Sequence, residues 1–168
     1  MNADNVTIIA LGSNVGDSQS ILLGAIERLE QLSSQPLMKS SLWQTTPVNC
    51  PPGSPMFLNA VVGMVPQATE TPESLLAKLL QIEKDFGRKS ATIPNEPRRL
   101  DLDLITFGNT THASKELTLP HPRAHERRFV LQPLSEIAPN LILPGQRKTV
   151  AEVLAALNTE EKLVRLNS

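Results

Sequence analysis

The stretch Leu100-Asp101-Leu102-Asp103-Leu104-Ile105-Thr106-Phe107 alternates leucine and aspartate over its first half. Successive side chains of a β-strand point to opposite faces of the sheet. The alternation therefore predicts a strand whose leucines face a core and whose two aspartates share the other face. Their Cα atoms would lie roughly 6 to 7 Å apart, and carboxylates this close need a cation between them or a proton on one of them. An edge strand with two solvated aspartates is the alternative interpretation.

This stretch is the last of four expected strands, which alternate with two expected helices. Apolar, β-branched runs indicate the strands, and apolar residues at helical spacing indicate the helices. Asp17 and Thr71 are expected N-caps, and Gly87 is an expected C-terminal cap. The expected strands are residues 6–11, 38–45, 57–65 and 100–107, and the expected buried helix positions are Leu22, Ala25, Ile26, Leu29, Leu75, Leu79, Ile82 and Phe86.

The resulting order, βαββαβ with C-terminal additions, predicts a single α+β domain of the ferredoxin-like type. In that plan an antiparallel sheet carries helices on one face. Residues 117–119 are expected to pair back as a short strand, and Thr149 with Glu152 forms a capping box before a further helix. Trp43 is expected in the core. Residues 158–168 show no interpretable pattern.

Composition narrows the classes of function. The chain has 168 residues, of which 40% are hydrophobic and 20% charged, as in ordinary globular domains. A net charge of −1 offers no general basic field for nucleic acid or anionic lipid. The single cysteine, Cys50, cannot form an internal disulfide, the first residues lack a signal-peptide pattern, and no apolar run approaches the ~20 residues that span a bilayer. We therefore expect a soluble cytoplasmic protein without nucleic-acid or membrane partners.

Although the net charge of the chain is close to zero, basic residues are concentrated in two clusters. Arg88, Lys89, Arg98 and Arg99 precede the aspartates, and residues 120–128 hold three arginines and two histidines. Arginine presents a planar fork of donors that suits phosphate oxygens, so aspartates for Mg²⁺ with two basic clusters favour phosphoryl-type transfer. The second cluster could instead be a solvated helix start, or His121 and His125 could bind zinc, although no third ligand is evident.

Several motifs, taken together, resemble the hydroxymethyldihydropterin pyrophosphokinase family between about residues 6 and 155. The two most specific are Pro97-Arg98-x-Leu100-Asp101-Leu102-Asp103 and Leu119-Pro120-His121-Pro122. The others are Ala10-Leu11-Gly12-Ser13-Asn14, Phe57-Leu58-Asn59-Ala60 and Pro133-Leu134-x-Glu136-Ile137-Ala138-Pro139.

The resemblance implies transfer of diphosphate from ATP to 6-hydroxymethyl-7,8-dihydropterin, with release of AMP, in folate biosynthesis. It implies two Mg²⁺ ions held by Asp101 and Asp103. It further implies catalytic contacts to phosphates from Arg88, Arg98, His121 and Arg127. The nucleotide site would comprise Glu83, Leu104, Thr118, His121 and Arg127. The pterin site would comprise Thr45, Val48, Phe57, Asn59 and Phe129.

The sequence also departs from the family pattern in the loops expected over the substrates. Ser90 replaces a usual arginine, Asn95 and Glu96 replace an aromatic residue and a glycine, and Thr46 separates Thr45 from the usual proline. Three hypotheses follow: the pyrophosphokinase, a divergent paralogue that acts on a related pterin or binds pterin or nucleotide without efficient turnover, and a ferredoxin-like RNA-binding module. The last would require exposed aromatic residues on the sheet, and the chain has four Phe, one Trp and no Tyr.

Overall fold

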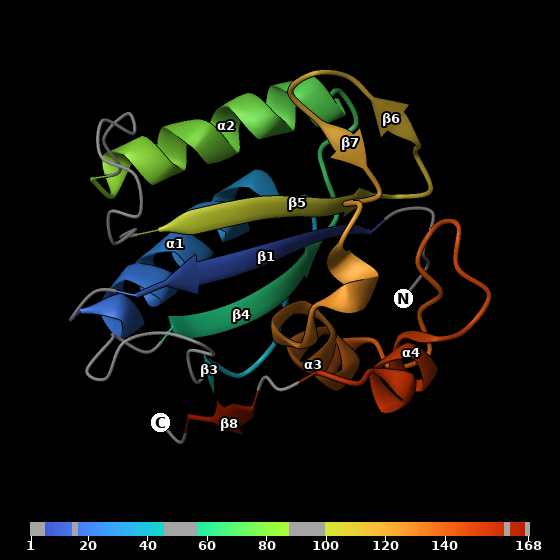
Figure 1. Ribbon diagram of the computed structural model, residues 1–168. Helices are drawn as coiled ribbons and strands as arrows, with labels where there is room; N and C mark the ends of the chain where they lie inside the picture. Colours follow the sequence, from blue (N-terminus) through green and yellow to red (C-terminus); the bar gives the residue numbers. More distant parts are fainter. Residues whose placement is uncertain (1–5, 15–16, 46–56, 88–99, 160–161, 167–168) are drawn as a thin grey trace.

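The computed structural model describes residues 6–14, 17–45, 57–87, 100–159 and 162–166 (Figure 1). Arg88, Arg98 and Val48, all expected site residues, lie outside these ranges. The elements in chain order are β1 (Thr7–Ser13), α1 (Ser18–Leu32), β2 (Met38–Lys39), β3 (Trp43–Thr45), β4 (Phe57–Met64), α2 (Pro72–Asp85), β5 (Asp101–Phe107), β6 (His112–Ala113), β7 (Thr118–Leu119), the 3₁₀ turn η1 (Ala124–Glu126), α3 (Arg128–Ile137), α4 (Val150–Ala156) and β8 (Leu163–Arg165).

The main sheet has the strand order β5-β1-β4-β3-β8, with β2 also paired to β4. All the pairs within it are antiparallel, and β1 lies between β4 and β5. This order confirms the ferredoxin-like α+β plan. β6 and β7 form a separate two-stranded ladder, which confirms that residues near 117–119 pair back.

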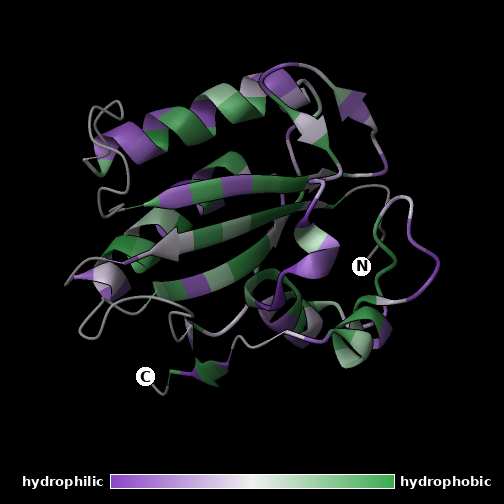
Figure 2. Cartoon of the chain, in the orientation of Figure 1, coloured by the Kyte–Doolittle hydropathy of each residue, from purple (hydrophilic) through white to green (hydrophobic). Residues whose placement is uncertain are grey.

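The sheet separates two apolar layers, and alternate residues of β1 belong to different layers. Hydrophobic residues are frequent along β1 and β4 (Figure 2). Ile9 and Leu11 join the core under α1 and α2, whereas Ile8 and Ala10 join a second core under α3 and α4. The expectation of helices on one face holds for the first two helices. The C-terminal additions pack on the opposite face, toward the end where β1 begins (Figure 1).

Local sequence signals explain the helix boundaries. Thr71 accepts from the backbone N–H of Ser74, and the Ser74 hydroxyl accepts from the Thr71 N–H, so a capping box opens α2 before Pro72. Gly87 follows α2 with φ 95°, a left-handed conformation that glycine adopts without a Cβ clash. Thr149 and Glu152 form the expected box before α4.

Four sequence expectations need correction or completion. Residues 38–45 form two short strands instead of one. Between them the Ser40 N–H donates to the Val61 carbonyl at 3.0 Å, but the Val61 N–H donates to the Ser40 hydroxyl at 2.9 Å and not to a backbone carbonyl, which interrupts the ladder. Asp17 stands at the N-cap of α1, but its side chain makes no capping hydrogen bond. Trp43 is only partly buried. Residues 163–165, which showed no pattern, pair with β3 as an edge strand.

Among the described residues, no helix is long and apolar enough to cross a membrane.

Candidate active site

The two aspartates lie at the beginning of β5, on the face that α3 and α4 leave partly open. Leu100, Leu102 and Leu104 are buried in the core under α1 and α2, and Asp101 and Asp103 are partly exposed on the other side. The leucines and aspartates therefore face opposite sides of the sheet, as the alternation predicted. Two partly solvated carboxylates on one face suit Mg²⁺, which prefers oxygen ligands and keeps several water or phosphate oxygens in its shell.

Glu83 of α2 forms a hydrogen bond to the backbone of β5. Its side chain is buried, and Oε2 accepts a hydrogen bond from the backbone N–H of Leu102 at 2.7 Å. Leu102 lies between the two aspartates, and β5 is at the edge of the main sheet. The carboxylate therefore satisfies a main-chain donor that an edge strand would otherwise leave without a strand partner.

His121 lies beside the aspartates after β7. Its backbone N–H donates to the carbonyl of Ile105 at 2.8 Å, which joins it to β5. The Arg123 N–H donates to His121 Nδ1 at 3.2 Å, so the neutral ring carries its proton on Nε2. Burial lowers the pKa of His121; nearby Asp103 opposes this, whereas Arg127 and Arg123 lower it further. The side chain is thus a neutral donor close to Asp103.

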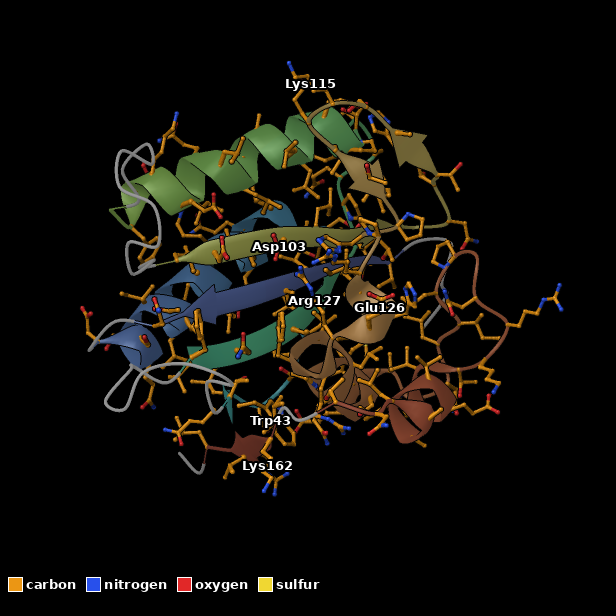
Figure 3. All side chains as sticks on the ribbon, viewed as in Figure 1. Trp43, Asp103, Lys115, Glu126, Arg127 and Lys162 are labelled. Atoms are coloured by element: carbon orange, nitrogen blue, oxygen red, sulfur yellow. The ribbon has the colours of Figure 1, made fainter. Side chains whose placement is uncertain are left out.

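The arginines that follow have different surroundings. The Arg127 guanidinium carbon lies 5.4 Å from the centre of the Phe129 ring, a cation–π arrangement at the start of α3. Arg128 instead donates to the carbonyl of Leu157 at 3.1 Å and to Thr159 Oγ1 at 3.3 Å. Asp103 and Arg127 lie on the same side of the sheet (Figure 3). Arg127, like Asp103, acts electrostatically on His121 and so lies near the aspartates, whereas Arg128 joins α3 to the segment after α4.

Asn59 and Thr45 form a polar pair at the other side of the open face. Asn59 Nδ2 donates to Thr45 Oγ1 at 2.5 Å, and both residues are buried. Gly12 is opposite Asn59 in the sheet, and a Cβ on Gly12 would lie 3.2 Å from Asn59 Oδ1. Phe57, the register partner of Thr45, is 40% exposed. An exposed aromatic ring near a buried amide can bind a flat polar ligand.

Sheet register connects the two parts of the site. Gly12 is opposite Asp101 on β5 and Asn59 on β4, and Asn59 is opposite Trp43 on β3. Residues directly opposite in antiparallel pairs share a face, so these four residues form one row across the sheet. Strands lie about 4.8 Å apart, which places the Asp101 and Asn59 backbones about 10 Å apart.

Two residues expected at the nucleotide site, Leu104 and Thr118, do not lie on the face of β5 that carries the aspartates. Leu104 is buried under α1 and α2, and Thr118 is exposed on β7. Within the described part of the chain, no group of three or more His, Cys, Asp or Glu residues could hold a metal. A zinc site at His121 and His125 therefore gains no further ligand there, whereas the aspartate pair needs none beyond water and phosphate.

Two features of the site were not found from the sequence. The Glu83–Leu102 contact joins residues far apart in the chain, and Glu83 was assigned only to a nucleotide pocket. Glu136, quoted above only as part of a motif, contacts Ser41 and Trp43 near the Asn59 pair. Glu136 stands in the last turn of a helix, where a carboxylate opposes the helix dipole, and this could have served as a signal.

Comparisons with known proteins agree with this geometry. The family model described as 7,8-dihydro-6-hydroxymethylpterin-pyrophosphokinase (HPPK) matches residues 8–139. A 2-amino-4-hydroxy-6-hydroxymethyldihydropteridine pyrophosphokinase of Haemophilus influenzae is 35% identical over 160 residues, which cover 95% of this chain and 96% of the relative. The Bacillus subtilis protein of the same name is 38% identical over 135 residues, which cover 80% of this chain and 78% of the relative.

Some relatives are much longer. The folic acid synthesis protein fol1 of Pneumocystis carinii is 39% identical over 149 residues, which cover 88% of this chain but only 20% of fol1. The crystal structure of wild-type Plasmodium falciparum HPPK-DHPS with pteroate has a TM-score of 0.69 at 13% identity, and the match covers 90% of this chain and 42% of that one. This structural likeness supports the fold alone. The family match and the relatives that align over most of their length show that the chain belongs to the 7,8-dihydro-6-hydroxymethylpterin-pyrophosphokinase family.

Proposed function

We propose that this protein transfers diphosphate from ATP to 6-hydroxymethyl-7,8-dihydropterin, giving AMP and the pterin diphosphate in folate biosynthesis. The observation that carries the proposal is the row Asp101–Gly12–Asn59, which has carboxylates at one end and a buried amide at the other. The separation of about 10 Å leaves room for a flat bicyclic ring at Asn59 with its hydroxymethyl group directed toward Asp101 and Asp103.

The pterin end would use Asn59, Thr45, Phe57 and Phe129, together with Val48, which lies outside the described residues. A pterin carries an amide edge that needs paired donors and acceptors, and an aromatic face that favours stacking. The Asn59–Thr45 pair supplies polar atoms, and the exposed ring of Phe57 supplies apolar surface.

The phosphate end would use Asp101 and Asp103 for two Mg²⁺ ions, which when bound neutralise the triphosphate charge. His121 would donate from Nε2 to a phosphate oxygen without adding a charge of its own, and Arg127 would supply a cation. Arg88 and Arg98, both outside the described residues, would add further phosphate contacts. Glu83, Leu104 and Thr118 remain proposed for the nucleotide end, Glu83 through its support of β5.

In the reaction, the hydroxymethyl oxygen forms a bond to the β-phosphorus of ATP. The bond between that phosphorus and the oxygen bridging to the α-phosphorus breaks, AMP leaves with this oxygen, and the hydroxyl proton passes to solvent. Positioning and charge stabilisation account for most of the catalysis in such transfers. We also place the protein in the cytoplasm, acting as a monomer on small molecules without nucleic acid or membrane.

The direct test is incubation of the protein with ATP, Mg²⁺ and 6-hydroxymethyl-7,8-dihydropterin, with AMP and the pterin product followed by chromatography. We expect stoichiometric AMP and pterin diphosphate, and neither product when the pterin is omitted or Mg²⁺ is chelated. Release of ADP, or AMP formation that does not depend on the pterin, would contradict the proposal.

A further inference from the structure

Glu136 joins α3 to the strand at the pterin end of the site. Its Oε1 accepts from the Ser41 N–H at 2.7 Å and from Trp43 Nε1 at 3.3 Å, and its Oε2 accepts from the Ser41 hydroxyl at 2.6 Å. Arg165 of β8 lies 3.9 Å from Oε2. One carboxylate thus contacts both the segment that leads into β3 and the strand beside it.

The surroundings of this carboxylate indicate that it acts as an anion. Burial alone would raise the pKa of Glu136, but the bonds from Ser41 and Trp43 and the charge of Arg165 hold the pKa below its ordinary value. The side chain is only 26% exposed. A carboxylate in the last helical turn opposes the helix dipole, and these donors offset that cost.

The strand that Glu136 contacts carries part of the proposed pterin site. Trp43 is directly opposite Asn59, and Thr45, two residues later, accepts the hydrogen bond from Asn59. β3 has only three residues, and so does its outer partner β8. Such short ladders hold a strand weakly, because few backbone hydrogen bonds fix its register. A contact from α3 to the strand therefore has a large effect on where Thr45 lies.

We propose that Glu136 is a positioning residue for pterin recognition: it fixes β3 through Ser41 and Trp43, and thereby holds Thr45 and Asn59 in the arrangement that binds the pterin amide edge. The inference rests on the proposed function. It assigns no contact between Glu136 and substrate. The described contacts of Glu136 do not include β5 or its aspartates. A change at Glu136 should therefore affect the pterin end of the site and not the phosphate end.

The test measures KM for the pterin, KM for ATP and kcat in Glu136→Ala and Glu136→Gln. We expect Glu136→Ala to raise KM for the pterin about tenfold, because pterin binding must then order β3 without the charge-assisted hydrogen bonds that hold it in the wild type, with KM for ATP and kcat within about twofold of wild type. Glu136→Gln keeps one acceptor oxygen and should raise KM for the pterin by only about threefold. A merely structural role would change all three constants together.

The matched control is Ser135→Ala, on the same helix turn. The Ser135 hydroxyl donates to the carbonyl of Gln132 within α3, so its loss removes a hydrogen bond inside the helix and not one to the segment that leads into β3. We expect wild-type constants for this variant. Trp43 is the only tryptophan, so a single indole N–H signal in an NMR spectrum of the ¹⁵N-labelled protein reports its bond to Glu136.

The outcomes separate the inference from the proposed function. A shifted indole signal with a selective rise in KM for the pterin supports the positioning role. Equal rises in both KM values, or an unchanged KM for the pterin in a folded variant, overturn it while wild-type turnover stands. If Glu136→Ala does not fold, Glu136→Gln decides by the same criteria. If wild type neither binds nor converts the pterin, the proposed function fails and the inference falls with it.

Discussion

Glu83 Oε2 accepts a hydrogen bond from the backbone N–H of Leu102, which lies between Asp101 and Asp103. A buried carboxylate on one helix thus fixes the strand that presents both proposed metal ligands. Glu83, which the sequence assigned to a nucleotide pocket, thus acts on the position of the strand that carries the proposed metal ligands.

Removing this acceptor should destabilise the protein. Glu83→Ala leaves the Leu102 N–H without its partner in a buried place, and we expect the free energy of unfolding to fall by about 1–3 kcal/mol. Glu83→Gln retains an oxygen that can accept the same bond and should lose less. Urea unfolding of both variants measures the difference, and equal stability of Glu83→Ala and wild type would show that the contact contributes nothing.

The aspartates should matter for turnover and little for stability. Asp101→Asn and Asp103→Asn each remove a charge from a partly exposed face, so we expect turnover to fall at least about 100-fold, with the unfolding free energy within about 0.5 kcal/mol of wild type. Raising the Mg²⁺ concentration should restore part of the rate. Asp85→Asn is the matched control, because Asp85 is an exposed aspartate of α2 paired with Arg28 at 2.9 Å. Near-wild-type activity of either site variant would contradict the metal role.

His121 should make stability depend on pH. Its pKa in the folded protein is lowered below the ordinary value of 6.5, so the unfolded chain takes up the proton first as the pH falls. The free energy of unfolding should therefore decrease as the pH falls below 6.5, until the folded form also protonates. His121→Gln removes this component. Urea unfolding at pH 7.5 and 5.5 checks it, and an identical decrease in both proteins would count against the assignment.

Substitutions of the two adjacent arginines should have opposite effects: one should lower stability and the other activity. Arg128 bonds to Leu157 and Thr159, so Arg128→Ala should cost about 1–2 kcal/mol of unfolding free energy and leave turnover within about twofold. Arg127→Ala should leave stability within about 0.5 kcal/mol and lower kcat/KM about 100-fold. Each variant is the control for the other, and the reverse pattern would exclude Arg127 from the phosphate site.

The features predicted from the sequence depend on local patterns. The alternation of leucine and aspartate in β5 and the capping box of Thr149 with Glu152 follow from residues close together, so periodicity and caps were enough to find them. The contacts of Glu83 with Leu102 and of Glu136 with Ser41 join segments 19 and 95 residues apart. Local patterns contain no information about such pairs. β8 was missed for the same reason, since three residues gain strand structure only through their partner β3.

The close approach at Gly12 gives a final test of the proposed row. A Cβ at this position would lie 3.2 Å from Asn59 Oδ1, so Gly12→Ala should displace the Asn59 amide and raise KM for the pterin about fivefold to tenfold, with little change in KM for ATP. Gly63→Ala in β4 is the control, because its new Cβ would meet side chains only at ordinary contact distances of 3.5 Å or more. Asp101 is also opposite Gly12, so a rise in KM for ATP alone would mean that the substitution acts through β5, and Asn59 would then not be the pterin contact.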